Sequence, residues 1–168
     1  MNKKTTLKAI ILFAIFYLIT SRNSVSEKIG EIVSDYTEPR GIRNNNPMNI
    51  RKSSNDWQGK IVGEDTAFET FVSPAYGIRA GAKTLLNYQK FYGLNTVNQI
   101  ISRFAPASEN NTNAYATHVA DYLGVGLNEP ITVKDRIYDL VTVIILHENG
   151  YNPYDTQVIN SGVSLALA

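Results

Sequence analysis

The hydrophobic pattern of this chain changes its period at Pro74. Before Pro74, short segments rich in Thr, Val, Ile and Phe alternate with turns, and 48–52, 58–62 and 66–72 fit strands. After Pro74, apolar residues recur three and four positions apart, which is the spacing of amphipathic helices. No internal repeat interrupts this order. The pattern predicts a mainly helical α+β domain with a small antiparallel β region.

Start signals divide the second part of the chain into helices. Pro74 suits the first turn of a helix, and Thr96 and Asp155 are typical N-cap residues. Thr132 and Asp135 have the spacing of a capping box, with Asp in place of Glu. A short helix is also predicted within 24–36. The main predicted helices are 75–92, 97–104, 113–123, 133–148 and 156–167.

The N-terminal residues have the charge pattern of a targeting segment. Lysines precede an uncharged apolar run from Ala9 to Ile19, which is shorter than the roughly 20 residues of a membrane-spanning helix. This pattern fits a secretory signal peptide or a short uncleaved anchor, so we expect a membrane contact here. We predict a signal or anchor segment at 1–22, a linker at 23–39 and the folded domain at 40–168.

The composition excludes several classes of protein. Hydrophobic residues make up 43% and charged residues 18% of the chain, so a globular domain is expected. The net charge of +1 gives no general attraction to nucleic acid, and the paired basic residues at 40–43 and 51–52 are more typical of solvated loops. Cysteine is absent and histidine occurs twice, which argues against disulfides, thiolate chemistry and a metal centre. No cofactor is expected.

Glu148 continues the apolar stripe of the predicted helix 133–148. Ile137, Leu140, Val141 and Ile144 have the spacing of one buried face, and Glu148 follows Ile144 by four positions. Desolvation and the helix C-terminus both favour the neutral form of a carboxyl group. We therefore expect Glu148 to hold a proton at the edge of the core, as a general acid must. A solvated terminal residue, or a buried one bonded to amides, is the alternative.

Several segments resemble lysozyme-like enzymes that cleave peptidoglycan. "IILHENGYNP", 144–153, resembles the catalytic-glutamate segment of lytic transglycosylases, in which a helix ends in Glu-Ser-Gly. The segments at 44–60, 67–86 and 111–119 resemble those of bacterial cell-wall N-acetylglucosaminidases. Residues 40–168 also resemble phage virion proteins with the motif "GIRNNNPGNIR", although Met48 replaces a glycine. The resemblance implies a lysozyme-like catalytic domain.

The order of these segments departs from that of the glucosaminidases. Their catalytic helix precedes the segment that 44–60 resembles, whereas the helix that ends at Glu148 follows it. We therefore predict a circularly permuted arrangement, in which Glu148 docks against the β region. A position of Glu148 far from that region, or of Glu38 within the cleft, would contradict this prediction.

The resemblance implies a reaction and its residues. In lytic transglycosylases one glutamate acts first as acid and then as base, and the sugar's own hydroxyl completes the reaction, so Glu148 would suffice to cleave the bond between N-acetylmuramic acid and N-acetylglucosamine. If a second carboxylate takes part, Glu109 is the main candidate, although a turn or capping role is favoured. Asp65 and Glu69 are weaker candidates. Predicted sugar-binding residues, each with a structural alternative, are Asn46, Asn49, Trp57, Asn111, Tyr115 and Tyr151.

These features predict a peptidoglycan-cleaving enzyme of a phage. It would be virion-associated or membrane-anchored, would act in the bacterial periplasm during entry or lysis, and could contact other virion proteins. Two alternatives stay open. One is a non-catalytic virion structural or cell-wall-binding protein with the same fold, and the other is an endopeptidase of the peptide stems.

Overall fold

The computed structural model describes residues 38–107 and 111–168. The predicted signal or anchor segment, 1–22, and nearly all of the predicted linker, 23–39, lie outside the described residues, as does the predicted helix within 24–36. Glu109 also lies outside them. In the described part of the chain, no helix is both long and apolar enough to cross a membrane.

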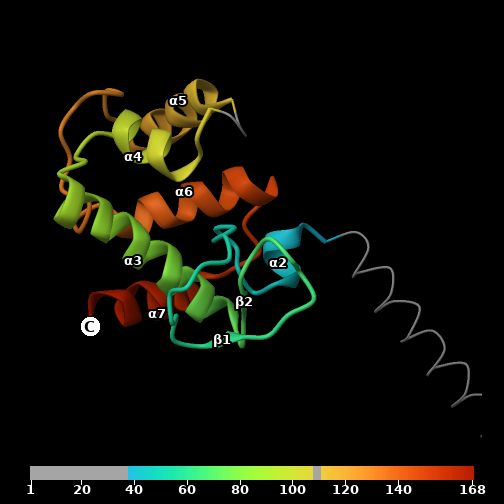
Figure 1. The fold of residues 1–168 in the computed structure, drawn as a ribbon. Coiled ribbons are helices and arrows are strands. Elements are labelled where there is room, and N and C mark those ends of the chain that lie inside the picture. Colours follow the sequence, from blue (N-terminus) through green and yellow to red (C-terminus); the bar gives the residue numbers. More distant parts are fainter. Residues whose placement is uncertain (1–37, 108–110) are drawn as a thin grey trace, which may run out of the picture. The chain divides into compact units, whose positions relative to one another are not determined.

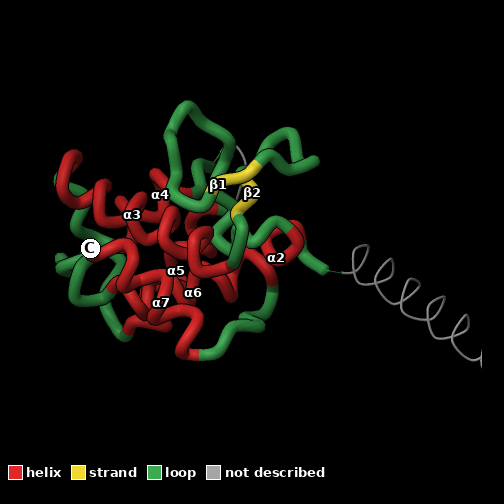
Figure 2. Tube along the Cα trace, turned by 90° about the horizontal axis from the view of Figure 1, so that it is seen from below, coloured by secondary structure: helices red, strands yellow, loops and turns green. Residues whose placement is uncertain are grey.

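Helices dominate the described chain, as the sequence predicted (Figure 1). Figure 2 shows the two short strands and their loops on one side of the helical body. The strands are antiparallel, with Lys60 opposite Phe71 and Ile61 opposite Thr70. An isolated bridge joins Arg51 to Phe68, so all three predicted strand segments pair, but over fewer residues than predicted. The elements are α2 (Arg40–Arg43), β1 (Lys60–Ile61), β2 (Thr70–Phe71), α3 (Pro74–Tyr92), α4 (Val97–Phe104), α5 (Thr112–Leu123), α6 (Ile137–Asn149) and α7 (Thr156–Leu167).

Most helix boundaries follow from local signals in the sequence. The Thr96 hydroxyl accepts a hydrogen bond from the Gln99 N–H at the start of α4. The Asp155 carboxylate accepts one from the Val158 N–H at the start of α7. α6 ends at Gly150, whose φ of 76° lies in the left-handed region that glycine adopts most easily.

Two predictions of secondary structure were wrong. The helix predicted from residue 133 begins at Ile137, and the residues before it form turns in which the Arg136 N–H donates to the Thr132 carbonyl. These turns are tied to α3, because the Gln89 side chain accepts a hydrogen bond from the Val133 N–H. Residues 40–43, predicted as part of a turn-rich segment, form the single helical turn α2.

Helix α6 lies at the centre of the core and contacts α3, α5 and α7 (Figure 1). Leu140, Val141 and Ile144 are buried, as the stripe predicted, and Val143 and Ile145 are buried too. Helix α3 packs closely along α7, where a side chain at Gly162 would collide with Ile78. Because α6 is surrounded, the residues at its C-terminal end have fixed positions.

The asparagine-rich loop 44–50 rests on helix α3. Asn46 is fully buried, and its side chain donates to the carbonyls of Ile50 and Glu69 and accepts from the Ile50 N–H. A Cβ at Gly77 would collide with the Asn45 carbonyl, and one at Gly81 would collide with Met48. The loop can therefore approach α3 closely only because these two positions are glycines. This packing fixes the loop that carries Asn49.

Candidate functional site

Two hydrogen bonds from distant parts of the chain hold the Glu148 carboxyl group. The Asn49 side-chain amide donates to Oε2 at 2.8 Å, and the Tyr115 hydroxyl donates to Oε1 at 2.9 Å. Asn49 belongs to the loop 44–50 and Tyr115 to α5, so three segments meet at one carboxyl group. Glu148 is half-buried. The helical stripe predicted apolar surroundings for Glu148. The two carboxyl oxygens contact polar groups instead.

The loop beside Glu148 is anchored to the end of α6. Asn149 is buried, and its side-chain amide donates to the Pro47 carbonyl and to the Ile145 carbonyl, each at 2.8 Å. Asn49 itself has a φ of 48°, a left-handed conformation that asparagine tolerates better than most residues. The predicted contact between Glu148 and the β region is thus present, through the side chain of Asn49. The circular permutation itself stays a prediction.

Tyr115 connects Glu148 to a pair of histidines. Its ring stacks on His147, with centroids 3.6 Å apart, and the Nδ1 atoms of His147 and His118 are 3.0 Å apart. Burial first, and then the charge and hydrogen bond of Glu148, raise the pKa of Tyr115 far above its usual value. The phenol is therefore a neutral donor at any physiological pH. Burial and the neighbouring His118 lower the pKa of His147.

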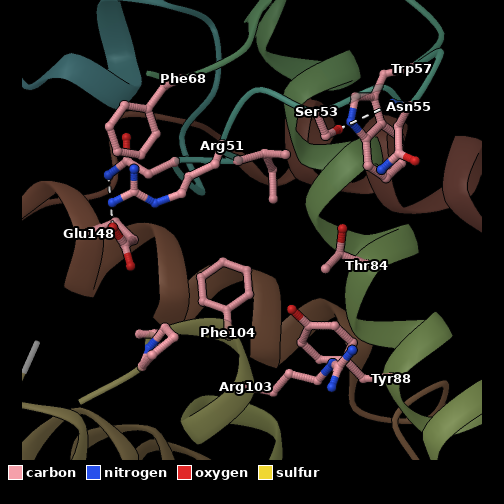
Figure 3. A pocket seen from close by; sticks show the side chains of 14 residues that line it. Arg51, Ser53, Asn55, Trp57, Phe68, Thr84, Tyr88, Arg103, Phe104 and Glu148 are labelled. Carbon is pink, nitrogen blue, oxygen red and sulfur yellow. Dashed lines mark hydrogen bonds between the residues drawn. The ribbon is translucent and has the colours of Figure 1, made fainter. Parts of the chain in front are cut away.

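Arg51 adds a positive charge on the cavity side of Glu148. Its guanidinium lies over the Phe68 ring, 4.9 Å from the centroid, and Arg40 lies 4.7 Å from the same ring. Figure 3 shows the Arg51 guanidinium directed toward Glu148. The carboxyl group thus faces a polar, partly cationic end of the cavity.

A cavity of about 550 Å³ opens in front of Glu148, a size typical of sites for small ligands. One wall comes from the loops of the β region, another from α3, and a third from the C-terminal end of α4 (Figure 3). Glu148 is the single carboxylate among the described lining residues. These are Asn49, Ile50, Arg51, Ser53, Asn55, Trp57, Phe68, Thr84, Tyr88, Arg103, Phe104, Ala105, Pro106 and Glu148.

The predicted site residues separate into two groups. Glu148, Asn49 and Trp57 line the cavity, and Tyr115 lies behind Glu148 as its hydrogen-bond donor. The remaining described ones lie elsewhere. The Asn46 side chain is fully hydrogen-bonded to the backbone around its own turn. Asn111 caps α5 by accepting a hydrogen bond from the Ala114 N–H. Tyr151 is 42% exposed and does not line the cavity.

The weaker carboxylate candidates have structural partners. Glu69 is buried and pairs with Lys60 at 2.9 Å, and it also accepts from the Ser53 N–H. Asp65 accepts hydrogen bonds from Asn44 and from two backbone N–H groups. Burial alone would raise the pKa of Asp65, but these hydrogen bonds and Arg40 outweigh it and lower the pKa. Neither residue lines the cavity, so neither is placed to act with Glu148.

Several lining residues were not predicted as site residues. Arg51, Phe68 and Arg103 reach the cavity from separate segments, and no local motif distinguishes them. Thr84 and Tyr88 carried a usable signal, because two residues four apart on the predicted helix 75–92 must share a face. Among the described residues, no three His, Asp or Glu side chains gather as metal ligands would.

Fold and site define a class of protein: a mainly helical α+β domain with a carboxyl group at the end of a buried helix, facing a cavity beside a small β region. The chain is 41% identical to Protein P5 of Pseudoalteromonas phage PM2 over an aligned region of 128 residues. The aligned region covers 73% of this chain and 79% of the phage protein. The chain therefore belongs to the same family as this phage protein. It matches no protein-family model.

Proposed function

We propose that this protein cleaves the glycan strands of peptidoglycan, with Glu148 as the proton donor. The observation that carries the proposal is the position of Glu148. It ends a rigid central helix, faces the cavity, and is held by Asn49 and Tyr115. A carboxyl group fixed in this way beside a sugar-sized cavity suits protonation of a glycosidic oxygen. The resemblance of 144–153 to the catalytic segment of lytic transglycosylases supports the same reaction.

The hydrogen bonds leave Glu148 able to act as acid and then as base. A carboxylate has about four lone-pair positions, and Asn49 and Tyr115 each occupy one on different oxygens. A proton can therefore be held on the side that faces the cavity. After it passes to the leaving oxygen, the two donors stabilise the carboxylate that remains, which then accepts a proton from the attacking hydroxyl group.

The source of the attacking hydroxyl distinguishes two reactions. In a transglycosylase the hydroxyl belongs to the sugar, and a single carboxyl group suffices; most hydrolases use a second carboxylate. Glu148 is the single carboxylate of the described cavity lining, which favours the transglycosylase reaction. Glu109, outside the described residues, is the candidate that would favour hydrolysis.

Aromatic and amide groups of the cavity suit sugar binding. Trp57, Tyr88 and Phe104 present rings to the cavity, and Asn55 and Ser53 add polar groups (Figure 3). The Trp57 indole N–H is closed off from solvent and has no hydrogen-bond partner among the described residues, so Trp57 offers a ligand its ring and not this donor. The phage relative supports an association with the virion, from which the enzyme would reach peptidoglycan in the periplasm.

Zymography on peptidoglycan tests the proposal, with mass spectrometry of the released fragments. Wild type should clear the gel and Glu148→Gln should not. Fragments with anhydromuramyl ends would identify a transglycosylase and reducing ends a hydrolase, whereas free stem-peptide ends would identify an endopeptidase and overturn the proposal. No clearing by wild type would favour the non-catalytic virion or wall-binding role.

A further inference from the structure

Arg103 lies at the cavity on a platform of two tyrosine rings. It occupies the last turn of α4, and its guanidinium carbon is 3.8 Å from the Tyr92 ring centroid and 5.2 Å from that of Tyr88. Both tyrosines belong to α3. Within the described residues no carboxylate lies within 4 Å of Arg103, although its side chain is exposed and lines the cavity. The charge is thus oriented by rings, and no acid of the described residues pairs with it.

The position of Arg103 separates it from the proposed reaction centre. Figure 3 shows the Phe104 ring between Glu148 on one side and Arg103 with Tyr88 on the other. Phe104 follows Arg103 in the chain and lines the same cavity. A ligand that fills the cavity would therefore touch Glu148 and Arg103 with different parts.

We propose that Arg103 selects the substrate by binding a carboxylate on a side group of the glycan. A guanidinium offers a planar set of donors that matches a carboxylate, and stacking on rings keeps its donor edge available. Peptidoglycan carries carboxylates on its peptide stems, and on lactyl groups that bear no stem, whereas chitin has a similar sugar backbone without them. The cavity would thus prefer acidic glycans to neutral ones. This inference rests on the proposed function, because it concerns the same cavity.

A simpler role for Arg103 is stabilisation of α4. A basic residue in the last turn of a helix favours the helix through its dipole, and the contacts with Tyr88 and Tyr92 add packing. That role predicts a lower melting temperature for Arg103→Gln and an equal change in binding to every glycan. A substrate-selecting role predicts a change that depends on the carboxylates of the glycan.

Co-sedimentation of the full chain with insoluble glycans separates the two roles. All variants carry Glu148→Gln to prevent digestion, and the probes are peptidoglycan, peptidoglycan with its carboxylates converted to amides, and chitin. Arg103→Gln should weaken binding to peptidoglycan by about tenfold or more and leave binding to chitin unchanged. Arg136→Gln is the control, because it removes the same charge at the N-terminal end of α6, far along the helix from Glu148. It should change binding to neither peptidoglycan nor chitin.

The amidated probe keeps the test valid if Arg103→Gln folds poorly. The chain with native Arg103 should bind amidated peptidoglycan about as weakly as the Arg103→Gln chain binds the untreated material. Equal binding of that chain to amidated and untreated peptidoglycan would overturn the inference, as would equal losses by Arg103→Gln on all three probes. If wild type clears no peptidoglycan, the proposed function fails, and the binding contrast is still measured on the same intact probes.

Discussion

Tyr115 holds Glu148 from one side and supports its neighbour His147 with its ring. The hydroxyl donates to Glu148 Oε1 at 2.9 Å, while the ring stacks on His147 with an interplanar angle of 12°. The side chain is 1% exposed, so this hydrogen bond is shielded from water. A hydrogen bond shielded from water contributes more than an exposed one. Tyr115 thereby fixes the carboxyl group in one orientation toward the cavity.

Removal of the Tyr115 hydroxyl should lower activity and preserve the fold. Tyr115→Phe keeps the ring on His147 but removes the donor to Glu148. We expect a loss of about 10- to 100-fold in the rate of peptidoglycan clearing. Tyr122→Phe is the matched control, because Tyr122 lies on the same helix and is exposed. Equal rates for Tyr115→Phe and wild type in a turbidity assay would show that the hydrogen bond does not matter.

A second carboxylate next to Glu148 should be unfavourable at neutral pH. Asn49→Asp replaces a donor by an acceptor 2.8 Å from Glu148 Oε2, and two carboxyl groups at this distance are compatible only when they share a proton. We expect the free energy of unfolding to fall by about 1–3 kcal/mol at pH 7 and by less at pH 4. Urea unfolding at both pH values measures this difference. Asn113→Asp, at an exposed position of α5, serves as the control and should change little.

The histidine pair should make stability depend on pH. The pKa of His147 is lowered in the folded protein by burial and by His118, from an ordinary value of 6.5. The folded state thus binds fewer protons than the unfolded state once the pH falls below about 6.5. The stability from this site is complete above that pH and is lost as the pH falls toward the lowered pKa. His118→Gln should reduce the fall in melting temperature between pH 7.5 and 5.5, and an unchanged fall would rule out this role of His118.

The glycines of α3 should be needed for the loop that carries Asn49. Gly77→Ala places a methyl group against the Asn45 carbonyl, which must move with the loop 44–50. We expect a loss of about 1–3 kcal/mol in the free energy of unfolding, with reduced activity. Gly126→Ala is the matched control, since its nearest neighbour would be an ordinary 3.5 Å away. Equal denaturation midpoints for the two variants would disprove the steric argument.

The sequence predicts the helices well because their boundaries depend on nearby residues. Thr96, Asp155 and Gly150 each start or end a helix through groups within a few positions. The start of α6 was predicted too early, and the turns before it are held by Gln89, far away in the chain, which accepts from the Val133 N–H. Local signals cannot reveal a partner so distant in the sequence.

The candidate site was only partly predictable for the same reason. The helical stripe identified Glu148 as a residue at the edge of the core, and the resemblance pointed to Asn49, Trp57 and Tyr115. No local pattern marked Arg51 or Arg103, because their place in the cavity arises only when separate segments fold together. Asn46 has the same residue type as Asn49 but satisfies its side chain within the turn.

The rate of peptidoglycan clearing by Glu148→Gln tests the central proposal most directly. Gln has nearly the same shape as Glu and can still pair with Asn49 and Tyr115, but it has no proton to give to a glycosidic oxygen. We expect a loss of at least about 100-fold, with an unchanged melting temperature, while the matched exposed variant Glu64→Gln keeps full activity. Clearing by Glu148→Gln at the wild-type rate would contradict the assignment of Glu148 as the proton donor.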